Sequence, residues 1–130
     1  MKRQIVVTDA APKAIGPYSQ AMWAGDFLFC AGQIPLDPAS GNMVTGGIAE
    51  QVTRALENIK GLLTSQDLTL ANVVKTTVFL SDMNNFAAMN EVYAKYFAKD
   101  FPARSTVQAV RLPKDALVEI EVVALVDDGG

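Results

Sequence analysis

Polar and charged side chains alternate with small or apolar ones along the last third of the chain. Within this set Arg104 and Glu119 carry opposite charges. A guanidinium binds a carboxylate through two parallel hydrogen bonds, and a carboxylate beside it positions or deprotonates a water molecule. The pair therefore predicts a site that binds a small carboxylic acid and activates water. The same spacing is equally consistent with a buried ion pair that has only a structural role.

Two strands must position these side chains. Residues 104–110 and 116–126 show strand alternation, and we expect a hairpin that joins them through residues 112–115. Matching like faces places these polar residues together: Arg104, Thr106, Gln108, Glu119 and Glu121. Gln108 then faces Glu119, and Arg104 lies roughly 13 Å further along at ~3.3 Å per residue. We therefore hypothesise that Arg104 of one chain meets Glu119 of another across a subunit boundary.

The composition excludes several kinds of catalytic site. The 130 residues include no histidine and one cysteine, and the formal net charge is −3. Ser-His-Asp and Cys-His catalysis, histidine-ligated zinc and an intrachain disulfide all need residues that are missing. The acidic balance also argues against nucleic acid and anionic membranes as partners. Cys30, within an apolar run, is expected to be a small buried residue.

The remaining segments predict an α+β protein with one domain over residues 1–130. Strands are expected at 5–7, 19–24, 27–32 and 73–80, with a II′ turn at Gly25-Asp26. An apolar stripe from Ile48 to Leu63 predicts one helix, and the stretch from Phe86 to Phe97 predicts another. The resulting order, β-β-β-α-β-α-β-β, favours a mixed sheet with both helices on one face. Apolar runs are too short for a signal peptide or a membrane span, so we expect a soluble cytoplasmic protein.

The last strand predicts what covers the second face of the sheet. Val118, Ile120 and Val122 point one way, while the other side carries Glu119, Glu121, Val123 and Leu125. A monomer would expose Val123 and Leu125 to water. We therefore expect an oligomer that buries this face.

Five separated blocks of the sequence resemble the RidA (reactive intermediate deaminase A, YjgF) family. They are Ile15-Gly16-Pro17-Tyr18, residues 31–35, residues 74–80, Phe101-Pro102-Ala103-Arg104-Ser105, and residues 111–115 through 119–121. The resemblance implies a chorismate-mutase-like fold and a homotrimer with ligand sites between subunits. It also implies cofactor-free and metal-free hydrolysis of 2-imino acids, notably 2-iminopropanoate and 2-iminobutanoate, to 2-oxo acids and ammonia.

The resemblance also assigns roles to individual residues. Arg104 is similar to the family arginine that binds the substrate carboxylate, Glu119 to the glutamate near the attacking water, and Tyr18 to a tyrosine at the site. Two further positions look like ligand contacts, namely Gly32 through its backbone and Asn90 near the cleft. Thr106 stands where the family commonly has cysteine, which puts substrate preference in doubt more than reaction class.

Two other functions remain as alternatives. A ligand-sensing or chaperone-like protein would use the same clefts to bind small carboxylates without turnover. Such a binder gains nothing from Glu119 unless its ligand carries a cationic nitrogen. An endoribonuclease or translation inhibitor, a role attached to some relatives, is disfavoured by the net charge and the missing histidine.

Overall fold

The computed structural model describes residues 3–126 and places them in the expected order of elements. The strands are β1 (Arg3–Val6), β2 (Ala21–Ala24), β3 (Phe27–Gln33), β4 (Val73–Leu80), β5 (Ala103–Gln108) and β6 (Val118–Leu125). The helices are α1 (Ile48–Thr64) and α2 (Phe86–Tyr96). Gly25 adopts φ +60° in the tight β2–β3 hairpin, as the first central residue of a II′ turn requires.

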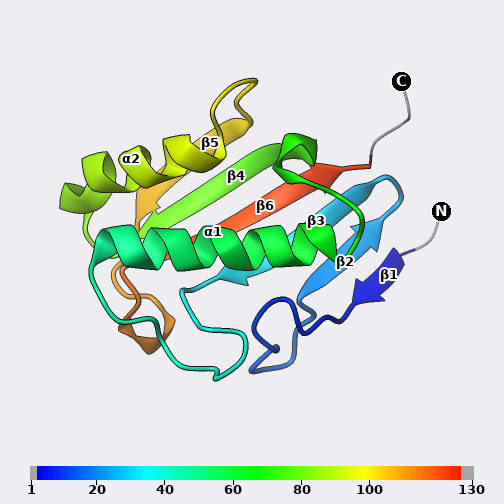
Figure 1. Ribbon diagram of the computed structural model, residues 1–130, viewed down its shortest axis with the longest axis horizontal. Coiled ribbons are helices and arrows are strands. Elements are labelled where there is room, and N and C mark those ends of the chain that lie inside the picture. Colours follow the sequence, from blue (N-terminus) through cyan, green and yellow to red (C-terminus); the bar gives the residue numbers. More distant parts are fainter. Residues whose placement is uncertain (1–2, 127–130) are drawn as a thin grey trace.

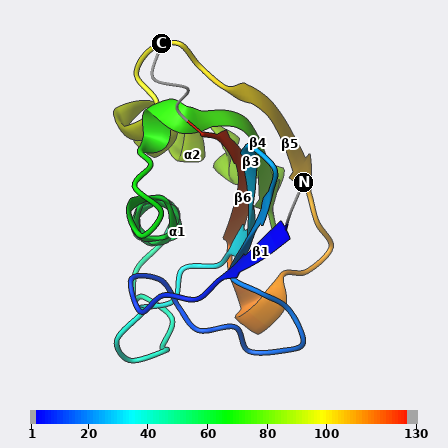
Figure 2. The same cartoon turned by 90° about the vertical axis from the view of Figure 1, so that its right-hand side faces the viewer.

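The six strands form one mixed sheet in the order β1-β2-β3-β6-β4-β5. β4 and β5 are parallel and all other neighbours are antiparallel. Both helices lie on the same side of the sheet, as the edge-on view shows (Figures 1 and 2). The α+β class, the mixed sheet and the one-sided helices are therefore confirmed.

The predicted hairpin of the last two strands is wrong. β6 lies between β3 and β4, whereas β5 lies at the sheet edge beside β4. Composition explains this placement, because the inner side chains of β6 are almost fully buried while β5 is largely exposed. A strand with apolar residues on both faces is stabilised most at the centre of a sheet, and a polar strand tolerates its edge.

The correct register divides the predicted polar face into two. Arg104, Thr106 and Gln108 pair with Thr76, Val78 and Leu80, which are buried beneath the helices. Glu119 and Glu121 pair with Phe79 and Thr77 on the opposite, helix-free face. Opposed residues in neighbouring strands point to the same side of a sheet. The five residues therefore do not share a face, and Gln108 faces Leu80 rather than Glu119.

The hydrophobic core lies between the sheet and α1. The apolar stripe of α1 is fully buried against inner side chains of β3, β4 and β6: Val52, Ala55, Leu56, Ile59, Leu62 and Leu63. On the helix-free face, by contrast, Phe27, Phe29 and Leu125 are 42%, 49% and 38% exposed. The expected apolar character of that face is confirmed, and its burial by an oligomer stays a prediction. No helix within residues 3–126 has the length and hydropathy to cross a membrane.

Candidate active site

Helix α2 holds the guanidinium of Arg104 beside β5. Arg104 Nη1 donates to Asn90 Oδ1 at 2.8 Å, and the guanidinium carbon lies 4.8 Å and 5.6 Å from the ring centroids of Tyr93 and Phe86. Phe86, Asn90 and Tyr93 are spaced four and three residues apart, so they share one face of α2. Two aromatic rings and one amide thus orient the guanidinium from one side, and we call this group the arginine site.

Buried hydroxyl groups support the arginine site from below. Thr76 Oγ1 and Tyr93 Oη are 2.8 Å apart, and Thr76 is fully buried. This bond fixes the ring on which Arg104 rests. Thr106, two residues along β5 on the same face, has a buried Oγ1 with no hydrogen-bond partner among residues 3–126. A buried hydroxyl without a hydrogen-bond partner is rare in folded proteins, which marks Thr106 as an unusual position beside Arg104.

The arginine site keeps its full positive charge. Within the described part of the chain, ion pairs join Lys60 to Glu57 and Arg111 to Asp115, and none involves Arg104. A cavity of about 460 Å³ opens beside it, lined also by Tyr93, Phe97, Phe101 and Pro102. A part-buried guanidinium held only by neutral groups is suited to bind an anion, and its planar fork matches a carboxylate.

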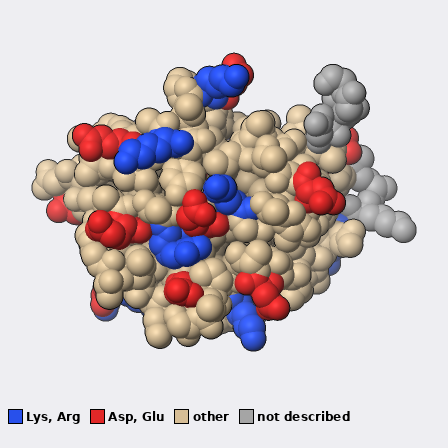
Figure 3. All heavy atoms as spheres, in the orientation of Figure 1, with Lys and Arg blue, Asp and Glu red and all other residues tan. Residues whose placement is uncertain are grey.

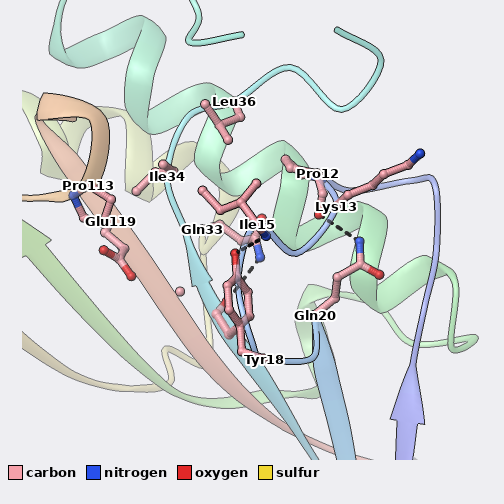
Figure 4. A pocket seen from close by; sticks show the side chains of 12 residues that line it. Pro12, Lys13, Ile15, Tyr18, Gln20, Gln33, Ile34, Leu36, Pro113 and Glu119 are labelled. Atoms are coloured by element: carbon pink, nitrogen blue, oxygen red, sulfur yellow. Dashed lines mark hydrogen bonds between the residues drawn. The ribbon is translucent and has the colours of Figure 1, made fainter. Parts of the chain in front are cut away.

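A second cavity of about 340 Å³ contains Tyr18, Gly32 and Glu119 (Figure 4). Apolar residues form much of its wall, among them Pro12, Ile15, Ile34, Leu36 and Pro113. Glu119 projects from β6 over the backbone of Gly32, so closely that a Cβ on Gly32 would collide with its carboxylate. Only glycine permits this approach without displacing Glu119. We call this cavity the glutamate pocket.

The loop before β2 places Tyr18 at the glutamate pocket. Tyr18 Oη accepts a hydrogen bond from the Ile15 N–H at 3.2 Å, and the side chain is 49% exposed. Gln20, at 5% exposure, fixes the loop by donating to the carbonyls of Ala11 and Pro12. In Figure 4 Glu119 lies on one side of the cavity and Gln20 on the other, with Tyr18 between them.

The Glu119 carboxyl group has a perturbed acidity. Burial raises its pKa above the usual value, and the neighbouring Glu121 carboxylate raises it further. A carboxylate that is hard to ionise and has no cation beside it holds a proton more readily than an exposed one. Such a group accepts a proton from a bound water molecule more readily than an exposed carboxylate does.

Cys30 lines neither the arginine site nor the glutamate pocket. Cys30 is buried as expected, and burial raises the pKa of its thiol to about 12. Across residues 3–126 no three His, Cys, Asp or Glu side chains gather closely enough to hold a metal ion.

The structure thus brings the predicted residues together in two groups. Arg104, Asn90 and Thr106 lie on the helix side, and Tyr18, Gly32 and Glu119 surround the other cavity. Sequence reasoning does not predict the contacts of Phe86 and Tyr93 with Arg104, because aromatic residues at helical spacing favour core packing. Their spacing from Asn90 on one helical face was the signal available in the sequence.

The fold and the cavities define a class of protein: a small α+β chain with one mixed sheet, helices on one face, and ligand-sized cavities at the sheet margins. The family model described as Endoribonuclease L-PSP matches residues 8–126. The chain belongs to this family, which is the RidA (YjgF, RutC) family that its motifs resemble.

Individual relatives cover nearly the whole chain. It is 55% identical over 122 residues to the RutC family protein PH0854 of Pyrococcus horikoshii, covering 94% of this chain and 97% of that protein. It is 46% identical over 123 residues to the human 2-iminobutanoate/2-iminopropanoate deaminase, covering 95% and 90%. The crystal structure of E. coli TdcF with bound serine superposes with a TM-score of 0.90 at 40% identity, covering 95% and 99%.

Proposed function

We propose that this protein hydrolyses reactive 2-imino acids, such as 2-iminobutanoate and 2-iminopropanoate, to 2-oxo acids and ammonia. The observation that carries the proposal is Arg104, a part-buried guanidinium that neutral groups orient and no carboxylate of the described chain neutralises. Relatives at 45–47% identity are named 2-iminobutanoate/2-iminopropanoate deaminase, which supports the same reaction.

In this reaction the protein mainly has to orient the substrate and a water molecule. Arg104 binds the substrate carboxylate, which fixes the neighbouring iminium carbon. Glu119 positions a water molecule and accepts its proton as the oxygen bonds to that carbon. The proton then passes from Glu119 to nitrogen. As the C–N bond breaks, the remaining hydroxyl group returns its proton to Glu119, which leaves a carbonyl and ammonia. Because an iminium carbon is already electrophilic, positioning and charge supply the acceleration without a cofactor.

The proposed reaction needs a second copy of the chain. Arg104 and Glu119 lie on opposite faces of one sheet, so one subunit cannot direct both at the same substrate. The exposed Phe27, Phe29 and Leu125 on the helix-free face are suited to a subunit contact. We therefore propose a homotrimer in which the arginine site of one subunit meets the glutamate pocket of another, with Tyr18, Gly32, Asn90 and Thr106 contributing ligand contacts.

The proposal is tested by coupling the protein to a threonine dehydratase. A nucleophilic trap competes with hydrolysis for the imine, and formation of 2-oxobutanoate and of trapped imine is followed. The arms are wild type, Arg104→Ala, Arg111→Ala and no addition. Arg111 is an exposed arginine paired to Asp115, so its loss controls for removal of positive charge. Wild type and Arg111→Ala should accelerate hydrolysis, and Arg104→Ala should lose saturable turnover.

The remaining outcomes each decide between functions. Turnover by Arg104→Ala at the wild-type rate would reject Arg104 as the carboxylate anchor. No acceleration by wild type would reject the deaminase and favour binding without turnover, the second candidate, for which the serine bound to E. coli TdcF is the specific observation. Ribonuclease activity is not favoured, because acidic and basic side chains are interspersed on the helix side (Figure 3).

A further inference from the structure

Buried polar side chains are few in this fold, and they gather around the two sites. Across residues 3–126 they are Gln20, Gln33, Gln51, Asn58 and Thr76. Thr76 supports the ring beneath Arg104. The four amides contact segments that form the glutamate pocket, which is a different part of the molecule. A buried amide is costly unless its hydrogen bonds are satisfied, so this distribution calls for a physical reason.

Asn58 holds the pocket wall that follows β3. It lies in the middle of α1 at 0% exposure. Its Nδ2 donates to the carbonyl of Leu36 at 2.9 Å and to that of Ile34 at 3.4 Å. Its Oδ1 accepts from Arg54 Nε at 3.2 Å. Ile34 and Leu36 both line the glutamate pocket, and the same segment begins two residues after Gly32, over which Glu119 lies.

Gln51, on the same helix, holds the residue just before β6, the strand that carries Glu119. Asn58 follows it by seven residues, so the two side chains project from one face of α1. Gln51 Oε1 accepts a hydrogen bond at 2.8 Å from the N–H of Leu117, two residues before Glu119. The two amides of α1 thus reach the chain on both sides of the contact between Gly32 and Glu119.

The third wall, the loop that leads to Tyr18, is fixed in the same way. The amide of Gln20 accepts from the Thr8 N–H at 2.8 Å and donates to the Pro12 carbonyl at 2.8 Å. This loop also rests directly on α1, because a Cβ on Gly61 would collide with the carbonyl oxygen of Ala10. Helix α1 therefore contacts three segments that form or adjoin the pocket.

We infer that Asn58, Gln51 and Gln20 are positioning residues, whose buried amides fix the pocket walls so that Glu119 stays aligned over Gly32. The expected effect on kcat rests on the proposed function, whereas the expected loosening of the pocket walls does not. An apolar side chain at position 58 would avoid the cost of burying an amide, but it would leave the Leu36 carbonyl without this donor. The polar residue instead holds specific backbone carbonyls in place, as a preorganised site requires.

The main test compares Asn58→Leu with Ile59→Val. Ile59 is the next residue of α1, is equally buried and packs in the main core away from the pocket. Loss of wall positioning should lower kcat for the imino acid about 10- to 100-fold, the size expected for a misplacement near 1 Å. KM should change less than threefold, because Arg104 binds the carboxylate elsewhere. Ile59→Val should retain the wild-type kcat.

Hydrogen exchange tests whether Asn58 fixes the pocket wall without measuring catalysis. The Leu36 and Val44 amides bond to the carbonyls of Ile34 and Pro35 in the segment that Asn58 holds. In Asn58→Leu the amide exchange rate should rise in residues 34–44 and stay at the wild-type value in β4 and β6. Ile59→Val should not show this local increase. A wild type without deaminase activity would refute the proposed function and leave this comparison decisive.

Gln51→Leu provides a second variant in case Asn58→Leu does not fold. It should lower kcat in the same way and increase exchange in residues 112–119 instead. If both folded variants kept wild-type kinetics and exchange, the amides would have no positioning role. A rise in KM with an unchanged kcat would equally overturn the inference.

Discussion

Gly32→Ala tests whether the close approach of β3 to Glu119 serves catalysis. The new Cβ would lie 2.9 Å from Glu119 Cδ and 3.1 Å from Cγ. Carbon atoms settle at about 3.5–4.0 Å, so the carboxyl carbon must move by about 0.6–1.1 Å. A misplacement near 1 Å costs roughly 100-fold in rate, which is the fall in kcat/KM that we expect.

The fold should tolerate this change. The colliding atoms belong to a side chain that is not fully buried, so Glu119 can turn aside. We expect the free energy of unfolding to change by less than about 1 kcal/mol. Urea unfolding, monitored by the fluorescence of Trp23, measures this quantity, and the coupled dehydratase assay measures kcat/KM.

Gly16→Ala is the matched control for Gly32→Ala. Its Cβ would meet the Tyr18 ring at 3.6 Å, an ordinary contact, in the loop that borders the same pocket. It should keep the activity of wild type. Equal activity in wild type and Gly32→Ala would refute the argument that Glu119 must lie over Gly32. Equal losses in the two variants would show that the effect arises from the added methyl group alone.

Three further predictions follow from burial. Because the pKa of Glu119 is raised in the fold, its ionised form destabilises the folded state at pH 7, and Glu119→Gln should unfold at a higher urea concentration than wild type. This gain should vanish as the pH falls towards 4, and a variant less stable than wild type at pH 7 would contradict the argument. Tyr93→Phe leaves the buried Thr76 hydroxyl unpaired and should cost about 1–3 kcal/mol, partly recovered by adding Thr76→Val; unchanged stability would contradict the bond. Cys30 should react with a thiol reagent only after unfolding in guanidinium, and rapid labelling of the folded protein would count against its burial.

Local patterns predicted the elements, because helix and strand periods are properties of neighbouring residues. The apolar stripe that starts at Ile48 correctly predicted the first residue of α1. The alternation along β6 correctly placed Val118 and Ile120 on one face and Glu119 and Glu121 on the other. The turn at Gly25 was also predicted, because glycine between two strands is typical of a II′ turn. Gly25 indeed adopts φ +60°, which favours glycine.

Strand neighbours were not predictable in the same way. Consecutive strands are usually adjacent, and this preference produced the wrong hairpin of residues 104–110 and 116–126. The register argument then carried the error onward, because matching polar faces assumes that the two strands touch. The apolar residues on both faces of β6 are typical of a central strand. Its two neighbours, β3 and β4, are both distant along the chain, and even β4 is separated from it by α2 and β5.

Residue chemistry alone predicted the candidate sites only where a side chain is charged, whereas Gly32 and Asn90 were predicted through the family resemblance. Arg104 and Glu119 were identified as charged residues in an apolar setting. Tyr93 was not, because a tyrosine on an apolar helix face predicts core packing. It is indeed buried, and it also carries the guanidinium on its ring. Its role depends on β5 passing beside α2, which is a tertiary fact.

The separation of Arg104 from Glu119 within one chain leaves each group without an oppositely charged partner among residues 3–126. Arg104 has no carboxylate partner within residues 3–126, and Glu119 meets burial and a second carboxylate rather than a cation. In the proposed assembly the two charges approach across the subunit boundary. A carboxylate substrate bound to the guanidinium neutralises it there, so that Arg104 does not offset the raised pKa of Glu119. Substrate binding itself would thereby preserve the proton affinity that Glu119 needs to accept a proton from water.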